Sequence, residues 1–290
     1  CKMWLMRQPW CPRGGLNPSD IGQGVNLHMR PFLVALSFVL FCHSLAWAQT
    51  SDMQPVRGFA IDRHEVSIGD FARYVQATGA VTAAEQRGGG ETYEGGWVQR
   101  KGWTWRAPFG LPASAKEPAV HIYFHEAKAY CVWAGKRLPT DAEWMEAAYT
   151  QRRPNPPAGF VTGKTYPYPT GDSPLGANCL GDCGEVQTLV GYASPAVTSR
   201  GRGHVLTGST RVGVNGLWDM GGNAWEWTDN SAQGDDTERP TRGGSWWYGS
   251  AQMHRDHLQS KPANTSVVYI GFRCAKSLIP VPYSSRGTAR

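Results

Sequence analysis

The stretch Gly216-Leu-Trp-Asp-Met-Gly-Gly-Asn-Ala-Trp-Glu-Trp-Thr-Asp229 combines a glycine pair, three tryptophans and three acidic residues in one short run. Paired glycines let the backbone turn sharply or adopt positive φ. Carboxylates spaced across such a turn, with main-chain carbonyls between them, suit a hard cation such as calcium. The same run is also compatible with a tight turn above a tryptophan-rich core, because motif matches produce false positives. Spacing alone leaves both interpretations open.

Four further motifs accompany this run in a fixed order along the chain. They are Phe59-Ala-Ile-Asp-Arg-His-Glu-Val-Ser67, Ala134-Gly-Lys-Arg-Leu-Pro-Thr-Asp-Ala-Glu-Trp144, Arg242-Gly-Gly-Ser-Trp246 and Ile270-Gly-Phe-Arg-Cys274. On these residues the chain resembles the formylglycine-generating-enzyme (sulfatase-modifying factor) superfamily over nearly all of residues 56–276. The resemblance implies one compact α+β domain of the C-type-lectin-like kind, with little regular secondary structure.

Local patterns predict a few regular elements within this domain. We expect strands at residues 56–62 and 118–124, and a helix at residues 126–134 that stops at Gly135. Ser67 with Asp70, and Thr140 with Glu143, have the spacing of capping boxes that open two further helices. Residues 85–115 and 151–215 are rich in Gly, Pro and Ser and read as long loops.

The N-terminal part of the chain has the pattern of an export signal. An apolar run of roughly a dozen residues follows Met29-Arg30 and ends in Ala46-Trp-Ala48, which is typical of a secretory signal peptide at residues 29–48. The run is shorter than the ~20 apolar residues that a membrane span needs. Because the signal peptide begins at Met29, we expect residues 1–28 to be an upstream extension outside the native protein. The domain would occupy residues 49–290 in the periplasm, with no membrane association after cleavage.

Charge argues against a nucleic-acid partner. The whole chain has a formal net charge of +6, but residues 1–48 hold four basic residues and one acidic residue, so residues 49–290 carry only +3. No basic stripe of the kind that binds nucleic acid remains. The oligomeric state has no signature in the sequence.

Four cysteines follow the predicted signal peptide, and an even number in an exported chain suggests disulfides. The family resemblance implies a bond between Cys131 and Cys274. Cys179 and Cys183 then pair locally or remain a C-x3-C dithiol, and we favour the local disulfide.

The resemblance also implies calcium as a structural ion. Carried over residue by residue, its ligands are the side chains of Asp219 and Glu226 and the carbonyls of Gly222 and Ala224. A second calcium would involve Asn178, although the other ligands of that ion do not map cleanly onto this chain.

Copper is not expected at the position where authentic formylglycine-generating enzymes bind it. Their two cysteines lie three and eight residues after the serine of the Arg-Gly-Gly-Ser motif, and here Tyr248 and Met253 occupy those positions. Thiolates suit Cu(I), whereas a phenol and one thioether do not replace them. Activation of sulfatases is therefore disfavoured as a function.

The residues around this position predict a pocket for a flat, conjugated ligand. Aromatic rings with polar tips can floor such a pocket, and histidines can move protons near neutral pH. An alternative is that the tryptophans belong to the core and the histidines to a solvated loop. The expected substrate-binding residues are Trp225, Ser245, Trp246, Trp247 and His257, and the expected catalytic residues are Tyr248, His254 and Asp256.

Within the superfamily, the run Gly-Gly-Ser-Trp-Trp-Tyr-Gly in an exported chain resembles the branch that matures the siderophore pyoverdine. That resemblance implies oxidation of dihydropyoverdine, a ring system on an exported peptide, with molecular oxygen as the oxidant. The alternative is a non-catalytic, calcium-stabilised binding or assembly protein, for example an accessory factor for a periplasmic metalloenzyme such as nitrite reductase.

Overall fold

The computed structural model describes residues 52–184, 203–230 and 237–278. All of them belong to one unit, which spans Gln49–Arg290. The predicted upstream extension and signal peptide lie outside the described residues. In the part of the chain that is described, no helix has the length and apolar character needed to cross a bilayer.

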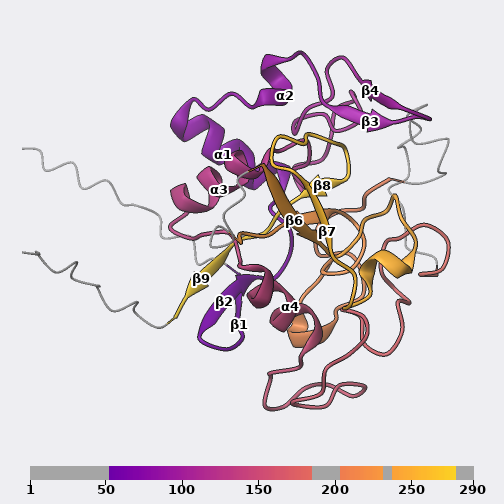
Figure 1. Cartoon of the computed structure of the whole chain (residues 1–290). Helices are drawn as coiled ribbons and strands as arrows, with labels where there is room; N and C mark the ends of the chain where they lie inside the picture. The colour runs from indigo at the N-terminus through magenta and orange to yellow at the C-terminus, as the bar shows by residue number, and fades with distance from the viewer. Residues whose placement is uncertain (1–51, 185–202, 231–236, 279–290) are drawn as a thin grey trace, which may run out of the picture. The chain divides into compact units, whose positions relative to one another are not determined.

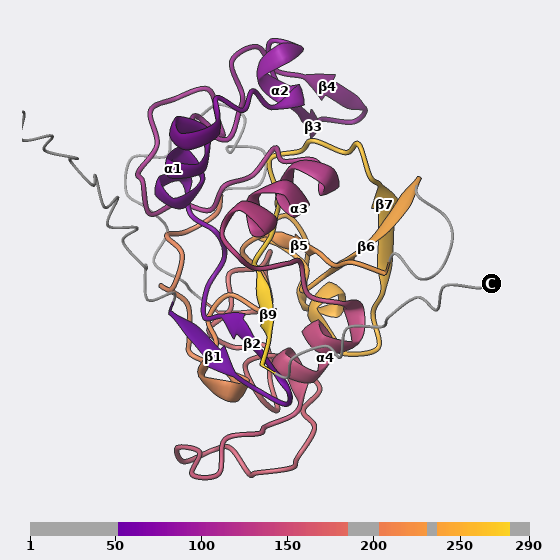
Figure 2. The same ribbon diagram turned by 90° about the vertical axis from the view of Figure 1, so that its left-hand side faces the viewer.

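A three-stranded antiparallel sheet joins the beginning and the end of the described chain. It has the order β1-β2-β9 (Figures 1 and 2). Its strands are β1 (Met53–Pro55), β2 (Phe59–Asp62) and β9 (Ala275–Ser277). The strand expected at residues 56–62 is thus present over Phe59–Asp62. Its antiparallel pairing with β9 places Phe59 opposite Ser277.

In each of the three longest helices, the backbone N–H of the N-cap residue donates to a carboxylate three residues later. They are α1 (Ile68–Thr78), α3 (Phe124–Trp133) and α4 (Asp141–Tyr149). The capping boxes predicted at Ser67 and Thr140 are confirmed, since side-chain and carboxylate acceptors satisfy N–H groups that have no partner in a first turn. Gly79 ends α1 in the left-handed conformation at φ 70°, as expected for a C-cap glycine.

The prediction of a strand at residues 118–124 is wrong. Pro118 makes only an isolated bridge with Ser67, and His121 adopts φ 59°, which an extended strand cannot include. The backbone N of Tyr123 donates to Glu126 Oε2 at 2.8 Å, so α3 starts at the next residue. Burial of an apolar run here reflects packing, not sheet pairing.

The long region at residues 85–115 contains more structure than its composition indicated. A short helix, α2 (Ala83–Gln86), precedes an antiparallel hairpin of β3 (Glu91–Tyr93) and β4 (Trp97–Gln99). Trp103 and Trp105 are buried in the main core, while Trp97 on β4 is 59% exposed.

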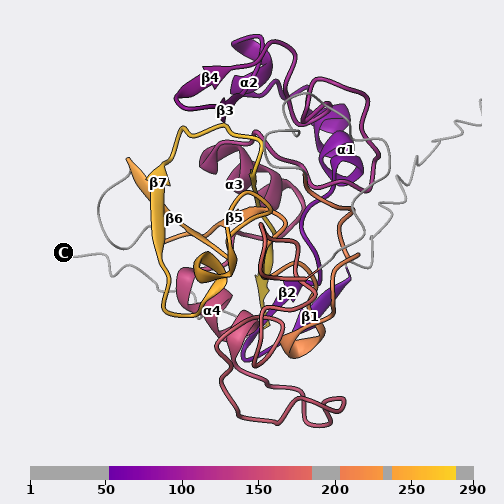
Figure 3. The ribbon, with the colours of Figure 1, turned by 90° about the vertical axis from the view of Figure 1, so that its right-hand side faces the viewer.

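A four-stranded sheet with the order β7-β6-β5-β8 lies at the centre of the structure (Figures 1 and 3). Its strands are β5 (Trp225–Trp227), β6 (Glu238–Arg242), β7 (Gln259–Pro262) and β8 (Ile270–Gly271). Only β5 and β8 run parallel. One 3-10 turn, at Val214–Gly216, precedes β5, and another, at Ser250–Met253, lies between β6 and β7. Because three of the quoted motifs supply β5, β6 and β8, they converge here.

Both predicted disulfides are confirmed, Cys131 with Cys274 and Cys179 with Cys183. The first joins α3 to the segment before β9 across 143 residues of sequence. Lys136 and Arg137 form ion pairs with Asp62 and Glu143. After α4 the chain forms an extended loop (Figures 2 and 3). An isolated β-bridge between Thr150 and Thr165 closes the base of this loop.

Candidate functional site

Strand β5 separates two different environments. Successive side chains of a strand point to opposite faces, so Glu226 faces away from Trp225 and Trp227. The Glu226 carboxylate accepts two hydrogen bonds from Arg273, each of 2.7 Å, and a third of 2.7 Å from Trp144 Nε1. The Arg273 and Glu226 side chains are 0% and 1% exposed, so this is a buried, bidentate ion pair.

Two further buried carboxylates belong to the same cluster. Glu65 accepts from Asn223 Nδ2 at 2.6 Å and from Ala224 N at 3.0 Å. Asp219, at φ 58°, accepts from Gly208 N at 2.5 Å and Thr210 Oγ1 at 2.6 Å. We call Glu65, Asp219, Glu226 and Arg273 the carboxylate cluster.

The carboxylate cluster contains more negative than positive charge. Burial raises the pKa of Asp219 and Glu226, and it raises that of Glu65 well above its usual value, with further repulsion from the other two carboxylates. Arg273 is the only cation among the four members, and a buried charge without a counter-charge is costly. The donor set therefore fits a divalent cation, which prefers such oxygens.

The predicted calcium ligands lie in this region. Asp219 and Glu226 belong to the carboxylate cluster, and the loop carrying the Gly222 and Ala224 carbonyls connects them. Gly222 has φ 77°, and a Cβ there would lie 2.3 Å from the Asn178 carbonyl oxygen, so only glycine fits. Calcium at these four residues stays a prediction.

Asn178 lies directly against that loop. Its carbonyl accepts from Asn223 N at 2.7 Å, and its Nδ2 donates to Gly203 O at 3.0 Å. Its Oδ1 is buried and has no hydrogen-bond partner among the described residues. This oxygen could serve as a metal ligand, and the second calcium stays a prediction.

On the other side of β5, an aromatic cluster surrounds Trp225. Ring centroids of Tyr248 and His257 lie 5.9 and 5.8 Å from that of Trp225. Lys261 Nζ on β7 lies 5.4 Å from the Trp225 ring centroid, within the range of a cation–π interaction. We call Trp225, Tyr248, His257 and Lys261 the Trp225 cluster.

Of the three aromatic residues that follow Ser245, two lie in the core and one is partly exposed. Trp246 and Trp247 are 0% and 4% exposed and belong to the main core, while Tyr248 is partly exposed. Ser245 is buried, and its Oγ accepts from Trp247 N at 3.3 Å. Substrate contact by these residues stays a prediction.

Three buried ring nitrogens of the expected substrate-binding residues have no hydrogen-bond partner among the described residues. They are Trp225 Nε1, Trp246 Nε1 and His257 Nε2. Because buried polar groups are nearly always paired, such exceptions call for an explanation such as water, an ion or a functional role.

Lys261 is a residue that the sequence analysis did not select. Burial lowers the pKa of Lys261 to about 8, against an opposing effect of Glu238. Burial, Arg242 and Lys261 together lower the pKa of His257. An amine that is partly neutral near pH 8 can accept a proton. No sequence motif marks Lys261, since its burial beside Trp225 arises from tertiary packing.

His254 and Asp256 lie together but apart from these contacts. His254 Nδ1 is 3.5 Å from Asp256 Oδ2, with side-chain exposures of 35% and 73%. The His254 ring packs on Tyr168, with centroids 5.4 Å apart. The two side chains are thus neighbours, and their catalytic role stays a prediction.

Comparison with known families identifies the chain. The model of the sulfatase-modifying factor enzyme 1-like domain (FGE-sulfatase) matches residues 47–278. The chain belongs to the sulfatase-modifying factor family. Within this family, Glu65 and Arg273 of the carboxylate cluster lie in two of the motifs that carried the resemblance, so the sequence already contained the signal for them.

Individual relatives agree with this assignment. The formylglycine-generating enzyme of Streptomyces coelicolor is 30% identical over 263 residues, covering 76% of this chain and 78% of the relative. The protein named inactive C-alpha-formylglycine-generating enzyme 2 of Bos taurus is 30% identical over 249 residues, covering 76% and 77%. The structure of PvdO from Pseudomonas aeruginosa superposes with a TM-score of 0.51 at 21% identity, covering 76% of this chain and 80% of PvdO. The fold is therefore the α+β, C-type-lectin-like fold of the family, as expected.

Proposed function

We propose that the protein is an exported maturation enzyme that oxidises the ring system of a peptide siderophore precursor, converting dihydropyoverdine to the mature fluorophore. Family membership and the fold likeness to PvdO support a maturation role. The resemblance of residues 243–249 to the pyoverdine-maturing branch supports the substrate. The proposed location is the periplasm, on the strength of the predicted signal peptide.

The observation that carries the proposal is that Trp225 Nε1, Trp246 Nε1 and His257 Nε2 are buried without a hydrogen-bond partner among the described residues. Indole and imidazole N–H groups can donate to oxygen or nitrogen atoms of a conjugated ring, while aromatic faces and edges pack against it. Leaving a buried donor unpaired costs about 1–3 kcal/mol, and a bound ligand that accepts these bonds would recover this free energy.

The reaction removes two hydrogen atoms from neighbouring ring atoms of the substrate and forms a double bond between them. The two electrons and two protons reduce molecular oxygen to hydrogen peroxide, so one substrate and one oxygen give one product and one peroxide. Lys261 Nζ is the proposed proton acceptor, because its pKa of about 8 lies near working pH. His257 is proposed to orient the ring by hydrogen bonding.

Calcium is the proposed structural ion, held by Asp219, Glu226 and the carbonyls of Gly222 and Ala224. When bound, it supplies positive charge to the carboxylate cluster. The second site at Asn178 is proposed as a weaker one, because fewer ligands map onto it.

Oxidation is tested by incubating the purified protein with dihydropyoverdine and following chromophore absorbance together with peroxide. We expect one peroxide per product and no reaction without oxygen. Trp246→Phe keeps the ring but removes one unpartnered N–H, and we expect a loss of about fivefold, equivalent to one hydrogen bond. Trp97→Phe, on the exposed hairpin, is the matched control. A rate equal to that in buffer alone would contradict the proposal.

A non-catalytic binding role is the second candidate. The favouring observation is that a relative of equal identity carries the name inactive C-alpha-formylglycine-generating enzyme 2. Calorimetry with the same precursor separates the two candidates, because stoichiometric binding without turnover identifies a binding or assembly protein.

A further inference from the structure

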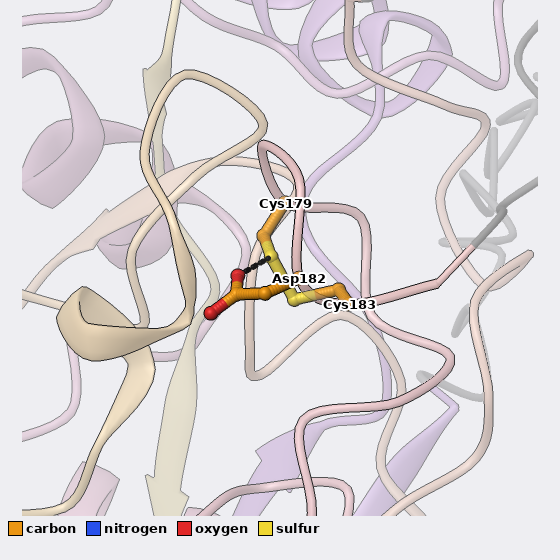
Figure 4. Close-up of side chains that lie close together, drawn as sticks. All are labelled: Cys179, Asp182 and Cys183. Atoms are coloured by element: carbon orange, nitrogen blue, oxygen red, sulfur yellow. Dashed lines mark hydrogen bonds between the residues drawn. A yellow bond between two sulfur atoms is a disulfide. The ribbon is translucent and has the colours of Figure 1, made fainter.

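A cluster of three sulfur atoms lies outside the regions discussed so far. Cys179 Sγ, Cys183 Sγ and one Asp182 carboxylate oxygen lie within 4.8 Å of one another (Figure 4). Met253 Sδ lies 3.6 Å from Cys183 Sγ. All three sulfur-bearing residues are 0% exposed and share a small apolar cluster with Ala177. The two cysteines form a disulfide in this structure.

The space for Met253 is shaped by Gly221 and Gly244, which belong to two glycine pairs of the quoted motifs. A Cβ at Gly221 would lie 2.9 Å from Met253 Cε, and one at Gly244 would lie 3.1 Å from Met253 Cγ. The Met253 backbone is held by Tyr149, whose hydroxyl donates to its carbonyl at 2.9 Å. The thioether is therefore held beside the cysteines by its surroundings.

The backbone of the cysteine loop is anchored independently of the disulfide. Leu180 N donates to Tyr248 O at 2.8 Å, and Gly176 N donates to Cys183 O at 2.9 Å. Asp182 accepts from Ser250 N at 2.9 Å and from Ser250 Oγ at 2.5 Å. These four bonds hold the cysteine loop, in which the Cys179 and Cys183 Cα atoms are 5.7 Å apart, against the segment that carries Met253.

We infer that Cys179, Cys183 and Met253 form a redox-gated site for one Cu(I) ion. Two thiolates and a thioether are the soft ligands that select Cu(I). With metal–sulfur bonds of about 2.3 Å, the sulfurs of a trigonal site lie about 4 Å apart, close to the Cys183–Met253 separation. Asp182 stays bonded to Ser250 and outside the coordination shell.

Opening the site requires a dithiol reductant. Thiol–disulfide exchange transfers two electrons and two protons to the cystine, giving two thiols, and the reductant becomes a disulfide. Cu(I) then displaces both thiol protons and binds the two thiolates and the thioether. The oxidised protein binds no copper here, since neither sulfur of a disulfide carries a thiolate.

The test is an anaerobic Cu(I) titration of the purified protein against a chromogenic Cu(I) chelator, before and after reduction and removal of the dithiol. We expect one Cu(I) per chain only after reduction, with three sulfurs at about 2.3 Å in X-ray absorption. The double variant Cys179→Ser/Cys183→Ser, which keeps all other cysteines, should lose that copper. These readouts are independent of the proposed oxidation.

Met253→Leu tests the thioether itself. It leaves the thiol count unchanged, and we expect two sulfur ligands and an affinity at least about tenfold weaker, since loss of even an outer partner costs about that. Met145→Leu on α4 is the matched control and should bind like the parent. Copper retained by the double serine variant, an unchanged affinity in Met253→Leu, or preferential binding of zinc with an oxygen ligand would each overturn the inference.

Discussion

Trp225 and Glu226 are neighbours on β5, yet the regions they enter differ in how their polar groups are satisfied. Each carboxylate of the carboxylate cluster accepts at least two hydrogen bonds, and the remaining imbalance is one of charge. In the Trp225 cluster, by contrast, Trp225 Nε1 and His257 Nε2 are buried without a hydrogen-bond partner among the described residues. The proposed calcium would balance charge in the first region, and the proposed substrate would bond to the nitrogens in the second. One strand thus separates the proposed calcium site from the proposed substrate site.

The largest expected effect comes from removing the cation of the carboxylate cluster. Arg273→Met leaves Glu226 buried without its partner, and breaking a buried pair in this way costs about 3–5 kcal/mol. Urea unfolding followed by tryptophan fluorescence measures the change. Arg255→Met, at a half-exposed arginine, should cost less than about 1 kcal/mol. Equal losses in both variants would remove the distinction between the two regions.

Lys261→Met should lower the oxidation rate by about a hundredfold, the lower range for loss of a general base. Because the neutral amine increases as pH rises through about 8, the parent rate should increase over that range and the variant rate should not. Lys261→Arg keeps the positive charge beside Trp225 without a neutral form. Full activity of the arginine variant would assign Lys261 a purely electrostatic role.

Variants of His257 and His254 test whether the substrate reacts beside Trp225 or beside Tyr168. His257→Ala should slow oxidation about tenfold, as expected when a positioning hydrogen bond to a reacting group is lost. His254→Ala should cost less, because its ring packs on Tyr168. Steady-state rates of both variants decide the matter, and the reverse order would move the reaction to the His254–Asp256 pair.

Calcium should stabilise the protein by about 1.4 kcal/mol at ten times its dissociation constant, a rise of about 3–5 °C in Tm. The folded pKa values of Glu65, Asp219 and Glu226 are raised. Protonated carboxylates therefore stabilise the calcium-free protein in acid, and this contribution is lost as pH rises through the folded pKa values. The calcium increment should accordingly grow with pH above about 4.5.

Thermal unfolding at several pH values, with calcium or with a chelator, checks this dependence. Asp219→Asn should reduce the increment, whereas Asp172→Asn, at an exposed carboxylate, should leave it unchanged. An increment that is independent of pH would mean that calcium does not bind these carboxylates.

Several features followed from local sequence alone. Capping boxes at Ser67 and Thr140 involve residues only three apart, so the chain needs no distant partner to form them. The ordered motifs identified the family and its fold, and the family pairing of Cys131 with Cys274 was correct. The strand at residues 118–124 failed because burial of an apolar run does not specify sheet pairing.

What the sequence determined by itself was the fold, the disulfide pairs and the residue types available for calcium. What only the tertiary structure decided was which of those residues meet. Glu65 and Arg273 join residues more than 150 and 40 positions away, Lys261 reaches Trp225 across the sheet, and Met253 approaches Cys183 through space left by two glycines. Such contacts depend on packing between distant segments, which a local pattern does not encode.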